Sequence, residues 1–334
     1  MDTNAGRKRI AEKAGVSKTT VTRVLSGNAS VSEKTKEKVL RVIDELGYTH
    51  NKLAINLSRN RNNNFIAMLV PDMTNYYYLQ MFDTIMRLLD GTDYTISVYH
   101  VTEQNMPQML DHILAYRVGA VINMSLSPLP SAYLKKLRCA NIKVIHPNKE
   151  EDPVQLTLDY AAAMRQAFDG MWQAGRRDFR FICGADDRYI VDRRIATFLR
   201  LLDAYGIADG KDTLVWGEYP LVSALQAGYD GMKKLADERV DAVFCLNDMM
   251  ALGAIKALRE AGKEAGRDVS VVGFDNILLG EYSQPRLSTV DSFVEEEARR
   301  YVDYIFERET QNCSIVSQYV ERDSARTELR CRWR

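Results

Sequence analysis

The hydrophobic pattern of the chain changes near residue 64. Up to about residue 48, apolar residues recur at helical spacing in three short stretches, the second of which contains Val21, Val24 and Leu25. Beyond residue 64, nearly continuous apolar runs such as FIAMLVP alternate with amphipathic stretches of helix length. Such runs are typical of strands buried on both faces of a parallel sheet, and the alternation indicates βαβ units. The sequence therefore predicts a small all-α segment followed by a doubly wound α/β body.

Eight apolar runs are the expected strands of this body. They are FIAMLVP, YTISVYHV, GAVINM and IKVIHP, followed by FRFICG, TLVWGEY, DAVFCLN and VSVVGFD. Helices are expected between them over 79–90, 106–116, 160–174, 190–205, 222–237 and 249–261. Because the runs form two similar sets of four, we expect two parallel-sheet lobes. Lobe 1 is expected over about 64–160 and 290–318, and lobe 2 over about 161–289.

The segment AGVSKTTVTRVLSGN, residues 14–28, is dense in β-branched residues, which favour strands. The surrounding residues indicate a helix–turn–helix instead, because Gly15 supplies a turn and Ser17 is suited to cap a second helix. If Val21 and Val24 face inward, a polar face remains that consists of Lys18, Thr19, Thr22 and Arg23. Such a face suits the major groove, where Thr methyls contact thymine and Arg reads guanine. A β-strand and a solvated helix face are the alternatives.

Charge is distributed unevenly although the whole chain is neutral. Residues 1–61 contain 13 Lys and Arg against 6 Asp and Glu, a net charge of +7, which leaves −7 on the remainder. A basic head on an acidic body suggests a polyanionic partner for the head. The five cysteines and four histidines are scattered, which predicts neither a disulfide framework nor a metal site. With no apolar run of membrane-spanning length and no signal peptide, we expect a cytoplasmic protein without membrane contact or cofactor.

The stretch IAEKAGVSKTTVTRVLSGNASVSEKTKEKVLRVIDELGY, followed by NKLAINL, closely resembles the headpiece of the lac repressor (LacI/GalR) family of bacterial transcription regulators. The similarity continues through LVPDMTNYYY, DAVFCLNDMMALGAIKAL, VSVVGFDN and PRLSTVD, and so covers nearly the whole chain. It implies a helix–turn–helix headpiece over 1–48 and a hinge helix with its linker over 49–63. Residues 64–334 would then form an effector-binding and dimerisation domain with two lobes resembling a periplasmic binding protein.

The resemblance also implies which residues contact operator DNA. The family's base-reading positions fall on Lys18 and Thr19, with Arg23 one turn later, and its hinge helix falls on 51–57. The leucine that the family wedges into a minor-groove step falls on Leu57. For the hydroxyl side chains in the set, helix capping is as good an explanation as phosphate contact. The predicted DNA-binding residues are Ser17, Lys18, Thr19, Thr20, Thr22, Arg23, Asn28, Ser32, Thr35, Asn51 and Leu57.

Some residues depart from the family pattern. Arg7 and Arg9 replace an apolar residue and an Asp at the start of the first helix, which adds phosphate affinity and leaves the start of that helix open. His50 replaces the proline before the hinge, which removes a preset φ angle. The tail SARTELRCRWR lacks the leucine heptads of the family's tetramers. We therefore expect a homodimer that pairs through its first lobes on a pseudo-palindromic operator.

Polar residues follow several of the expected strands, where a doubly wound sheet binds ligands. This spacing alone selects Asp72, Arg188, Tyr219, Asn247, Asp248 and Asp275. The resemblance adds Arg194 as a residue that grips the effector and Asp275 as an effector-binding carboxylate. It also implies that Tyr219 stacks on the ligand and that Tyr76 to Tyr78 lie in a covering loop. The predicted effector residues are Asp72, Tyr76, Tyr78, Arg188, Arg194, Tyr219, Asn247, Asp248 and Asp275.

Alternative roles apply to some of these residues. Asp248 precedes a helix and is as well suited to an N-cap as to a ligand contact. Asp72 can simply shape a turn, and a neighbouring tyrosine can pack in the core. Carboxylates with an aromatic plate suit a sugar, whereas Arg188 with Arg194 could hold a carboxylate or phosphate.

Three classes of protein compete at this point. A periplasmic-type sugar-binding protein shares the body but has no basic head. An enzyme is disfavoured, because no G-x-G-x-x-G, G-x-x-x-x-G-K-[ST] or G-x-S-x-G motif occurs. The sequence therefore predicts a ligand-responsive, sequence-specific DNA-binding transcription regulator. Repression of carbohydrate-utilisation genes, relieved by a sugar-type effector, is the expected behaviour, and a corepressor sign is the alternative.

Overall fold

The computed structural model describes residues 3–25, 30–48, 63–125, 128–146, 154, 156–184, 192–207, 210–235, 238–308 and 313–326. The chain divides into two compact units, Met1–Asn63 and Asn64–Arg334. The expected hinge helix over 51–57 lies outside the described residues. The same holds for five single residues discussed above, which are Asn28, His50, Asn51, Leu57 and Arg188.

The first unit contains three helices, α1 (Thr3–Ala14), α2 (Lys18–Leu25) and α3 (Glu33–Glu45). Gly15 has a φ of +61° in the turn between α1 and α2, a conformation in which a Cβ is unfavourable. The first helix begins at Thr3, so Arg7 and Arg9 lie within it rather than before it. The three helices enclose a small core of their own, which contains Ile10, Ala11, Ala14, Val21, Val24, Val39 and Val42.

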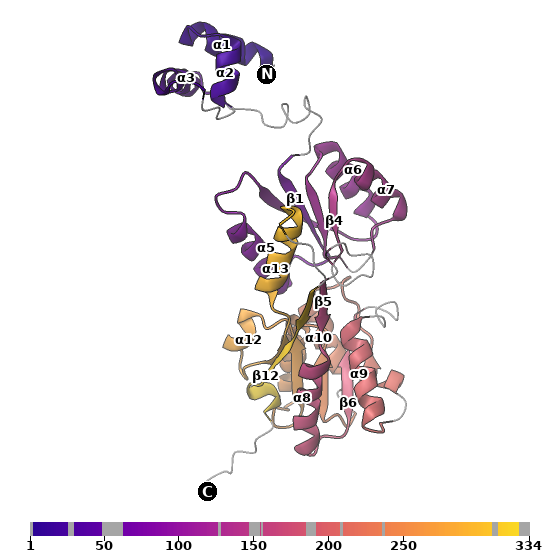
Figure 1. Ribbon diagram of the computed structural model, residues 1–334. Coiled ribbons are helices and arrows are strands. Elements are labelled where there is room, and N and C mark those ends of the chain that lie inside the picture. The colour runs from indigo at the N-terminus through magenta and orange to yellow at the C-terminus, as the bar shows by residue number, and fades with distance from the viewer. Residues whose placement is uncertain are drawn as a thin grey trace. The chain divides into compact units, whose positions relative to one another are not determined.

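The second unit opens with a parallel sheet in the order β2–β1–β3–β4 (Figure 1). Its strands are β1 (Phe65–Val70), β2 (Thr95–His100), β3 (Ala120–Asn123) and β4 (Lys143–Ile145), and its helices are α5 (Tyr76–Leu88), α6 (Met106–Tyr116) and α7 (Ser131–Cys139). Alternate residues of β1 enter different cores: Ile66 and Met68 join one cluster of buried side chains, whereas Ala67 joins another. Both faces of β1 are therefore covered, which explains its unbroken apolar sequence.

A second sheet has the order β12–β10–β9–β8–β6–β7, in which only β12 is antiparallel to its neighbour. Its strands are β6 (Phe179–Ile182), β7 (Leu214–Val215), β8 (Ala242–Cys245), β9 (Ser270–Phe274), β10 (Ser288–Asp291) and β12 (Gln318–Val320). The helices that accompany it are α8 (Ala161–Gln173), α9 (Arg193–Ala204), α10 (Ala224–Lys234), α11 (Asp248–Glu260) and α12 (Leu278–Tyr282). Short 3₁₀ turns lie at Gly210–Thr213 and Asp323–Ala325. Each of the eight predicted runs contains a strand, although TLVWGEY keeps only two strand residues at the sheet edge.

The chain passes more than once between the two large sheets. Strand β5 (Leu156–Asp159) pairs in parallel with β11 (Cys313–Val316), and α13 (Val294–Ile305) packs against α5 (Figure 1). The segment expected to return to the first lobe, about 290–318, corresponds to the residues between β10 and β12. Strand β10 continues in the six-stranded sheet to Asp291, and β12 rejoins that sheet from Gln318 by pairing with the exposed edge of β10.

No helix within the described parts of the chain is both long and apolar enough to span a bilayer.

Candidate functional site

The candidate DNA-contacting face lies on α2. Val21 and Val24 are buried against the other two helices of the head, whereas Lys18, Thr19 and Arg23 are exposed. This division gives the helix one apolar face and one basic, hydroxyl-bearing face, as the sequence predicts. The hydroxyl of Thr22 donates to the carbonyl of Lys18 at 3.0 Å, so this side chain folds back on its own helix.

The hydroxyl residues at the helix starts have local partners. The Ser17 hydroxyl accepts from the amide of Thr20 at 3.0 Å, which caps α2, and the two hydroxyl oxygens lie 2.9 Å apart. Ser32 occupies the N-cap position of α3, and its hydroxyl contacts that of Thr35 at 2.9 Å. Ser17 therefore acts as a capping group, which is one of the two explanations that the sequence leaves open, whereas the Ser32 hydroxyl makes no cap hydrogen bond to an amide of α3.

Asp72, directly after β1, connects the two lobes of the body. One carboxylate oxygen accepts from the Thr74 amide at 2.8 Å and from the Thr74 hydroxyl at 2.6 Å. The other accepts from the amide of Ala224 at the start of α10, 3.0 Å away. Asp72 is only 7% exposed, and both of its oxygens are engaged. It therefore shapes a turn and bonds the first turn of a helix of the other lobe, which agrees with the alternative role given to it in the sequence analysis.

Arg194 lies in the first turn of α9, and its side chain is held by Asp192, the N-cap residue of that helix. Its Nε and Nη2 donate to the two carboxylate oxygens of Asp192 at 2.9 and 2.6 Å, and Nη1 donates to the carbonyl of Leu246 at 2.7 Å. The guanidinium lies 5.8 Å from the centre of the Phe274 ring. Burial alone would lower the pKa of Arg194, but Asp192 reverses this effect and the pKa lies well above its ordinary value. Arg194 is thus a fixed cation at the carboxyl ends of β8 and β9.

Asp275 follows β9 and is 6% exposed. The Ser292 hydroxyl donates to its Oδ1 at 3.3 Å. Burial raises the pKa of Asp275 to about 7, although Arg194 acts in the opposite direction, and Glu297 adds to the rise. The carboxyl group is therefore poised near neutral pH to accept or to donate hydrogen bonds.

The two tyrosines expected to cover a ligand lie close to these charges. Burial is the main cause that raises the pKa of Tyr78, and Tyr219, Asp275 and Arg194 also act on it. Tyr219 is 1% exposed, and burial raises its pKa, with Asp72 and Asp275 adding to the rise and Tyr78 opposing it. Residues from five separate strand ends and helix starts thus form one electrostatic cluster. Tyr76, at the first position of α5, is half-buried and packs against the core.

Asn247 and Asp248 take different places from those expected. Asn247 is the N-cap of α11, because its side chain accepts from the amide of Met250 at 2.9 Å. Asp248 has no exposed surface, and its carboxylate accepts from the Thr289 hydroxyl at 2.6 Å and from the Ile277 amide at 2.8 Å. Asp248 therefore supports the loop after β9 through both of its carboxylate oxygens, and a contact with the effector stays a prediction.

Sequence reasoning missed Glu297, a buried residue of α13. The hydroxyl of Tyr77, on α5, donates to its Oε2 at 2.7 Å, and Tyr301 donates to its other oxygen. Burial raises the pKa of Glu297, and the two tyrosine hydrogen bonds oppose this rise. The residue lies in VEEEARR, an acidic start to an amphipathic helix, and this sequence carries no signal that separates one buried glutamate from its exposed neighbours.

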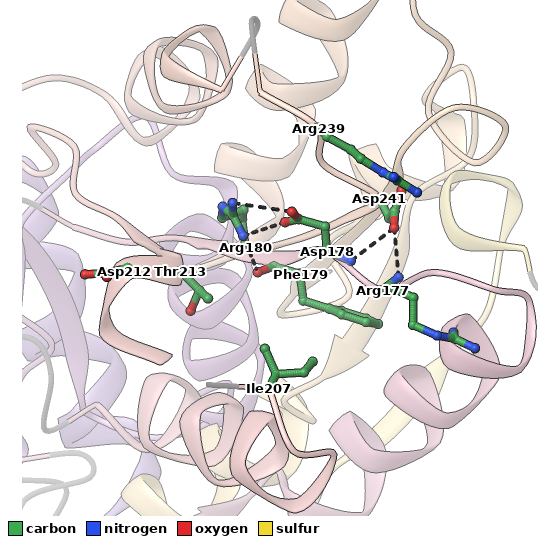
Figure 2. Close-up of a pocket in the computed structure, with 9 residues that line it drawn as sticks. All are labelled: Arg177, Asp178, Phe179, Arg180, Ile207, Asp212, Thr213, Arg239 and Asp241. Atoms are coloured by element: carbon green, nitrogen blue, oxygen red, sulfur yellow. Dashed lines mark hydrogen bonds and ion pairs between the residues drawn. The ribbon is translucent and has the colours of Figure 1, made fainter. Parts of the chain in front are cut away.

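A cavity of about 480 Å³ lies at the opposite edge of the six-stranded sheet, where β6 and β8 begin (Figure 2). Asp241 accepts there from the amides of Arg177 and Asp178 at 2.8 and 3.0 Å, while Arg180 pairs with Asp178. None of the predicted effector residues lines this cavity. Ligands of doubly wound sheets bind at the carboxyl ends of strands, so we place the candidate ligand site at Arg194 and Asp275.

Among the described residues, no group of three or more His, Cys, Asp or Glu side chains is placed to hold a metal ion. The arrangement therefore consists of a helix–turn–helix head with a basic face and a two-sheet body with a polar cluster at its strand ends. Together they define a class of protein, the ligand-responsive DNA-binding regulators.

Comparison with known proteins agrees with this class. Residues 8–51 match the family described as bacterial regulatory proteins, lacI family, and residues 168–325 match the periplasmic binding protein-like domain. A probable HTH-type transcriptional repressor, ExuR of Bacillus subtilis, is 29% identical over 96% of this chain and 98% of its own length. A structure of the transcriptional regulator CelR with cellobiose is 25% identical, with a TM-score of 0.64 over 95% of this chain and 99% of its own. A lacI-family regulator from Silicibacter pomeroyi has a TM-score of 0.79 at 23% identity, over 96% of this chain and 98% of its own.

Residues 8–51 match the lacI family of bacterial regulatory proteins, and the chain is similar over nearly its whole length to transcriptional regulators with the same kind of head. It is a ligand-responsive DNA-binding transcription regulator, and the alternative of a sugar-binding protein without regulatory DNA binding is set aside.

Proposed function

We propose that this chain represses carbohydrate-utilisation genes as a cytoplasmic homodimer without catalytic activity, and that a sugar-type effector releases it from its operator. The observation that carries the effector class is the set of buried polar groups beyond the carboxyl ends of the strands. Arg194 is fixed there by Asp192 and the Leu246 carbonyl, and Asp275 and Tyr219 are 6% and 1% exposed. Carboxylate and guanidinium groups bind vicinal hydroxyls, and a tyrosine ring covers the apolar face of a pyranose. The cellobiose complex of CelR, whose chain is similar throughout, supports the same class of ligand.

In this proposal the head reads the operator through the exposed face of α2. Lys18, Thr19 and Arg23 would contact base edges. Ser17, whose hydroxyl also caps α2, and Ser32 would add phosphate contacts. The domain organisation is that predicted from the sequence, with a headpiece over 1–48, a linking segment over 49–63 and a receptor over 64–334. Leu57, outside the described residues, would wedge into the minor groove.

The dimer would pair through its first lobes, and exposed apolar side chains of the body support such a contact. Leu79 and Met86, on α5 in the first lobe, are 54% and 43% exposed, which is high for residues of their size. Leu278 and Tyr282, on α12 in the second lobe, are 53% and 80% exposed. An effector that changes the angle between the lobes would then change the spacing of the two heads, a coupling of about 1 to 3 kcal/mol.

The proposal is tested by combining operator selection with a ligand screen. An operator is first selected from random duplexes at about 150 mM salt, since affinities for DNA depend steeply on salt. Thermal unfolding is then measured with cellobiose, lactose, ribose and glucuronate, with and without the selected operator. A sugar that stabilises the free protein and lowers its operator affinity supports the proposal. Absence of any sequence preference, or stabilisation by none of the sugars, contradicts its DNA-binding part or its effector part, respectively.

The wedge has its own test in Leu57→Ala. This variant should weaken operator binding far more than binding to random duplex, because only the bent operator accepts the side chain. Equal losses on the two kinds of DNA would contradict a role for Leu57 as a wedge.

A further inference from the structure

The loop that carries Asp275 has an unusual backbone. Asp275 and Asn276 have φ angles of +105° and +54°, in the region that favours glycine, although neither is glycine. Consecutive residues in this region cost free energy and persist only where the surrounding contacts hold them. The amides of the loop are all bonded: Asp275 donates to the Val290 carbonyl at 2.9 Å and Asn276 to the Thr289 hydroxyl at 3.3 Å. The third amide, that of Ile277, donates to Asp248, as described above.

The side chain of Asn276 links the loop to two distant parts of the chain. Its Nδ2 donates to Asp291 at the end of β10, 2.8 Å away. Its Oδ1 accepts from Nη2 of Arg322, also at 2.8 Å. Arg322 comes just after β12, in a C-terminal segment that the sequence analysis did not select.

Arg322 bonds three separate segments with one planar group. Besides Asn276, its Nη1 donates to the carbonyl of Leu287 at 2.8 Å, and its Nε lies 2.7 Å from a carboxylate oxygen of Glu281 on α12. The side chain is 12% exposed. A guanidinium presents its donors in a fixed plane, so these contacts fix the loop and α12 relative to each other, which a single flexible ammonium would not do.

We propose that Arg322 is a positioning residue of the effector site. It holds the loop of Asp275 and Asn276 in its strained conformation and joins that loop to α12, so that Asp275–Tyr282 moves as one rigid piece. The inference rests on the proposed role of Asp275 in binding the effector. It deepens that role, because α12 begins three residues after Asp275 and carries the exposed side chains of Leu278, Leu279 and Tyr282. A displacement of Asp275 by a ligand would therefore reach the surface of the second lobe.

Hydrogen–deuterium exchange on the full-length protein, without DNA or sugar, tests this inference. In Arg322→Ala, amides of Asp275–Tyr282 should exchange about 10-fold faster than in the wild type, because the loop loses its link to α12. Peptides that cover β6 and α9 should be unchanged. Arg326→Ala is the matched control, because Arg326 lies in the same segment and forms its ion pair with Asp323 rather than with the loop or α12. Its exchange at Asp275–Tyr282 should equal that of the wild type.

Two results would overturn the inference. Unchanged exchange at Asp275–Tyr282 would mean that Arg322 does not hold the loop, and faster exchange throughout the second lobe would mean that it only supports folding. If Arg322→Ala does not fold, Arg322→Lys is measured instead, which keeps the charge but not the planar fork. Since neither DNA nor sugar is present, a failure here is distinguishable from a failure of the proposed regulatory function.

Discussion

Asp275→Asn tests the electrostatics of the effector site. Burial raises the pKa of Asp275 to about 7 in the folded protein, although Arg194 opposes this rise. The pKa of an aspartate in an unfolded chain is about 4. The folded state therefore holds the proton more tightly. The stability that this group contributes is fully present below about pH 4 and is lost as the pH rises through about 7. The asparagine variant has no proton to lose at this position.

The size of the effect follows from this difference in pKa. At pH 8 the ionised carboxylate lowers the free energy of unfolding by roughly 4 kcal/mol, of which roughly 2 to 3 kcal/mol develops between pH 5 and pH 8. The free energy of unfolding of Asp275→Asn should therefore fall less than that of the wild type over this interval, by about that amount. Urea unfolding followed by the fluorescence of Trp172 and Trp216 measures it, because both lie in the lobe of the six-stranded sheet.

A control and a refuting outcome complete this test. Asp83 is 68% exposed on α5, so Asp83→Asn should show the same pH dependence as the wild type. The refuting outcome is a parallel fall in the free energies of unfolding of the wild type and of Asp275→Asn between pH 5 and pH 8. In that case the pKa of Asp275 is not raised by burial, and the electrostatic reasoning is wrong. The variant should also lose its response to the active sugar while its operator affinity without sugar is kept. An intact sugar response would exclude Asp275 as the ligand-binding carboxylate.

Three further variants test other parts of the molecule. Arg23→Ala should relax base preference at one position of each half-site, by about 1 to 3 kcal/mol in operator binding assays across single-base variants, and an unaltered preference would contradict base reading. Tyr77→Phe removes a 2.7 Å hydrogen bond to buried Glu297 and should lower the free energy of unfolding by about 2 kcal/mol in urea; no loss would show that the bond is dispensable. Gly228→Ala places a Cβ 1.9 Å from a backbone oxygen of α11, whereas Gly217→Ala meets its nearest backbone atom at 3.5 Å. The first should cost about 3 kcal/mol in the same assay and the second less than about 1 kcal/mol, and equal costs would contradict the close packing of α10 on α11.

Local signals in the sequence predicted the helices of the head and most of the body. Gly15 marks the turn between α1 and α2 because it has no Cβ and adopts a positive φ, and Ser17 marks the start of α2 because its hydroxyl accepts from the Thr20 amide. Both signals involve only neighbouring residues. The eight apolar runs predicted strands because a strand covered on both faces is apolar at every position. Strands β5, β10, β11 and β12 were missed because their sequences, LTLD, STVD, CSIV and QYV, place polar residues among the apolar ones and so form no long apolar run.

The candidate site was predictable only in part. Carboxylates after strands marked Asp275 and Asp72, because parallel strands end at one edge of a sheet. The sequence did not separate residues that face the ligand site from those that support it. Asp248 resembles Asp275 in its position after a strand, yet its oxygens are engaged by Thr289 and Ile277. That difference depends on where β10 lies beside β9.

The sequence by itself determined the basic helix–turn–helix, the succession of βαβ units and the strand ends at which a ligand site can form. These properties follow from periodicity, caps and charge within short segments, where neighbouring residues decide the free energy of the local conformation. Only the tertiary structure decided which distant groups share the site. Tyr77 bonds to Glu297 across 220 positions, and Asn276 to Arg322 across 46. Such pairs form because packing removes both groups from water, and a buried polar group needs a hydrogen-bonding partner nearby. No short stretch of sequence shows which distant residue will be that partner.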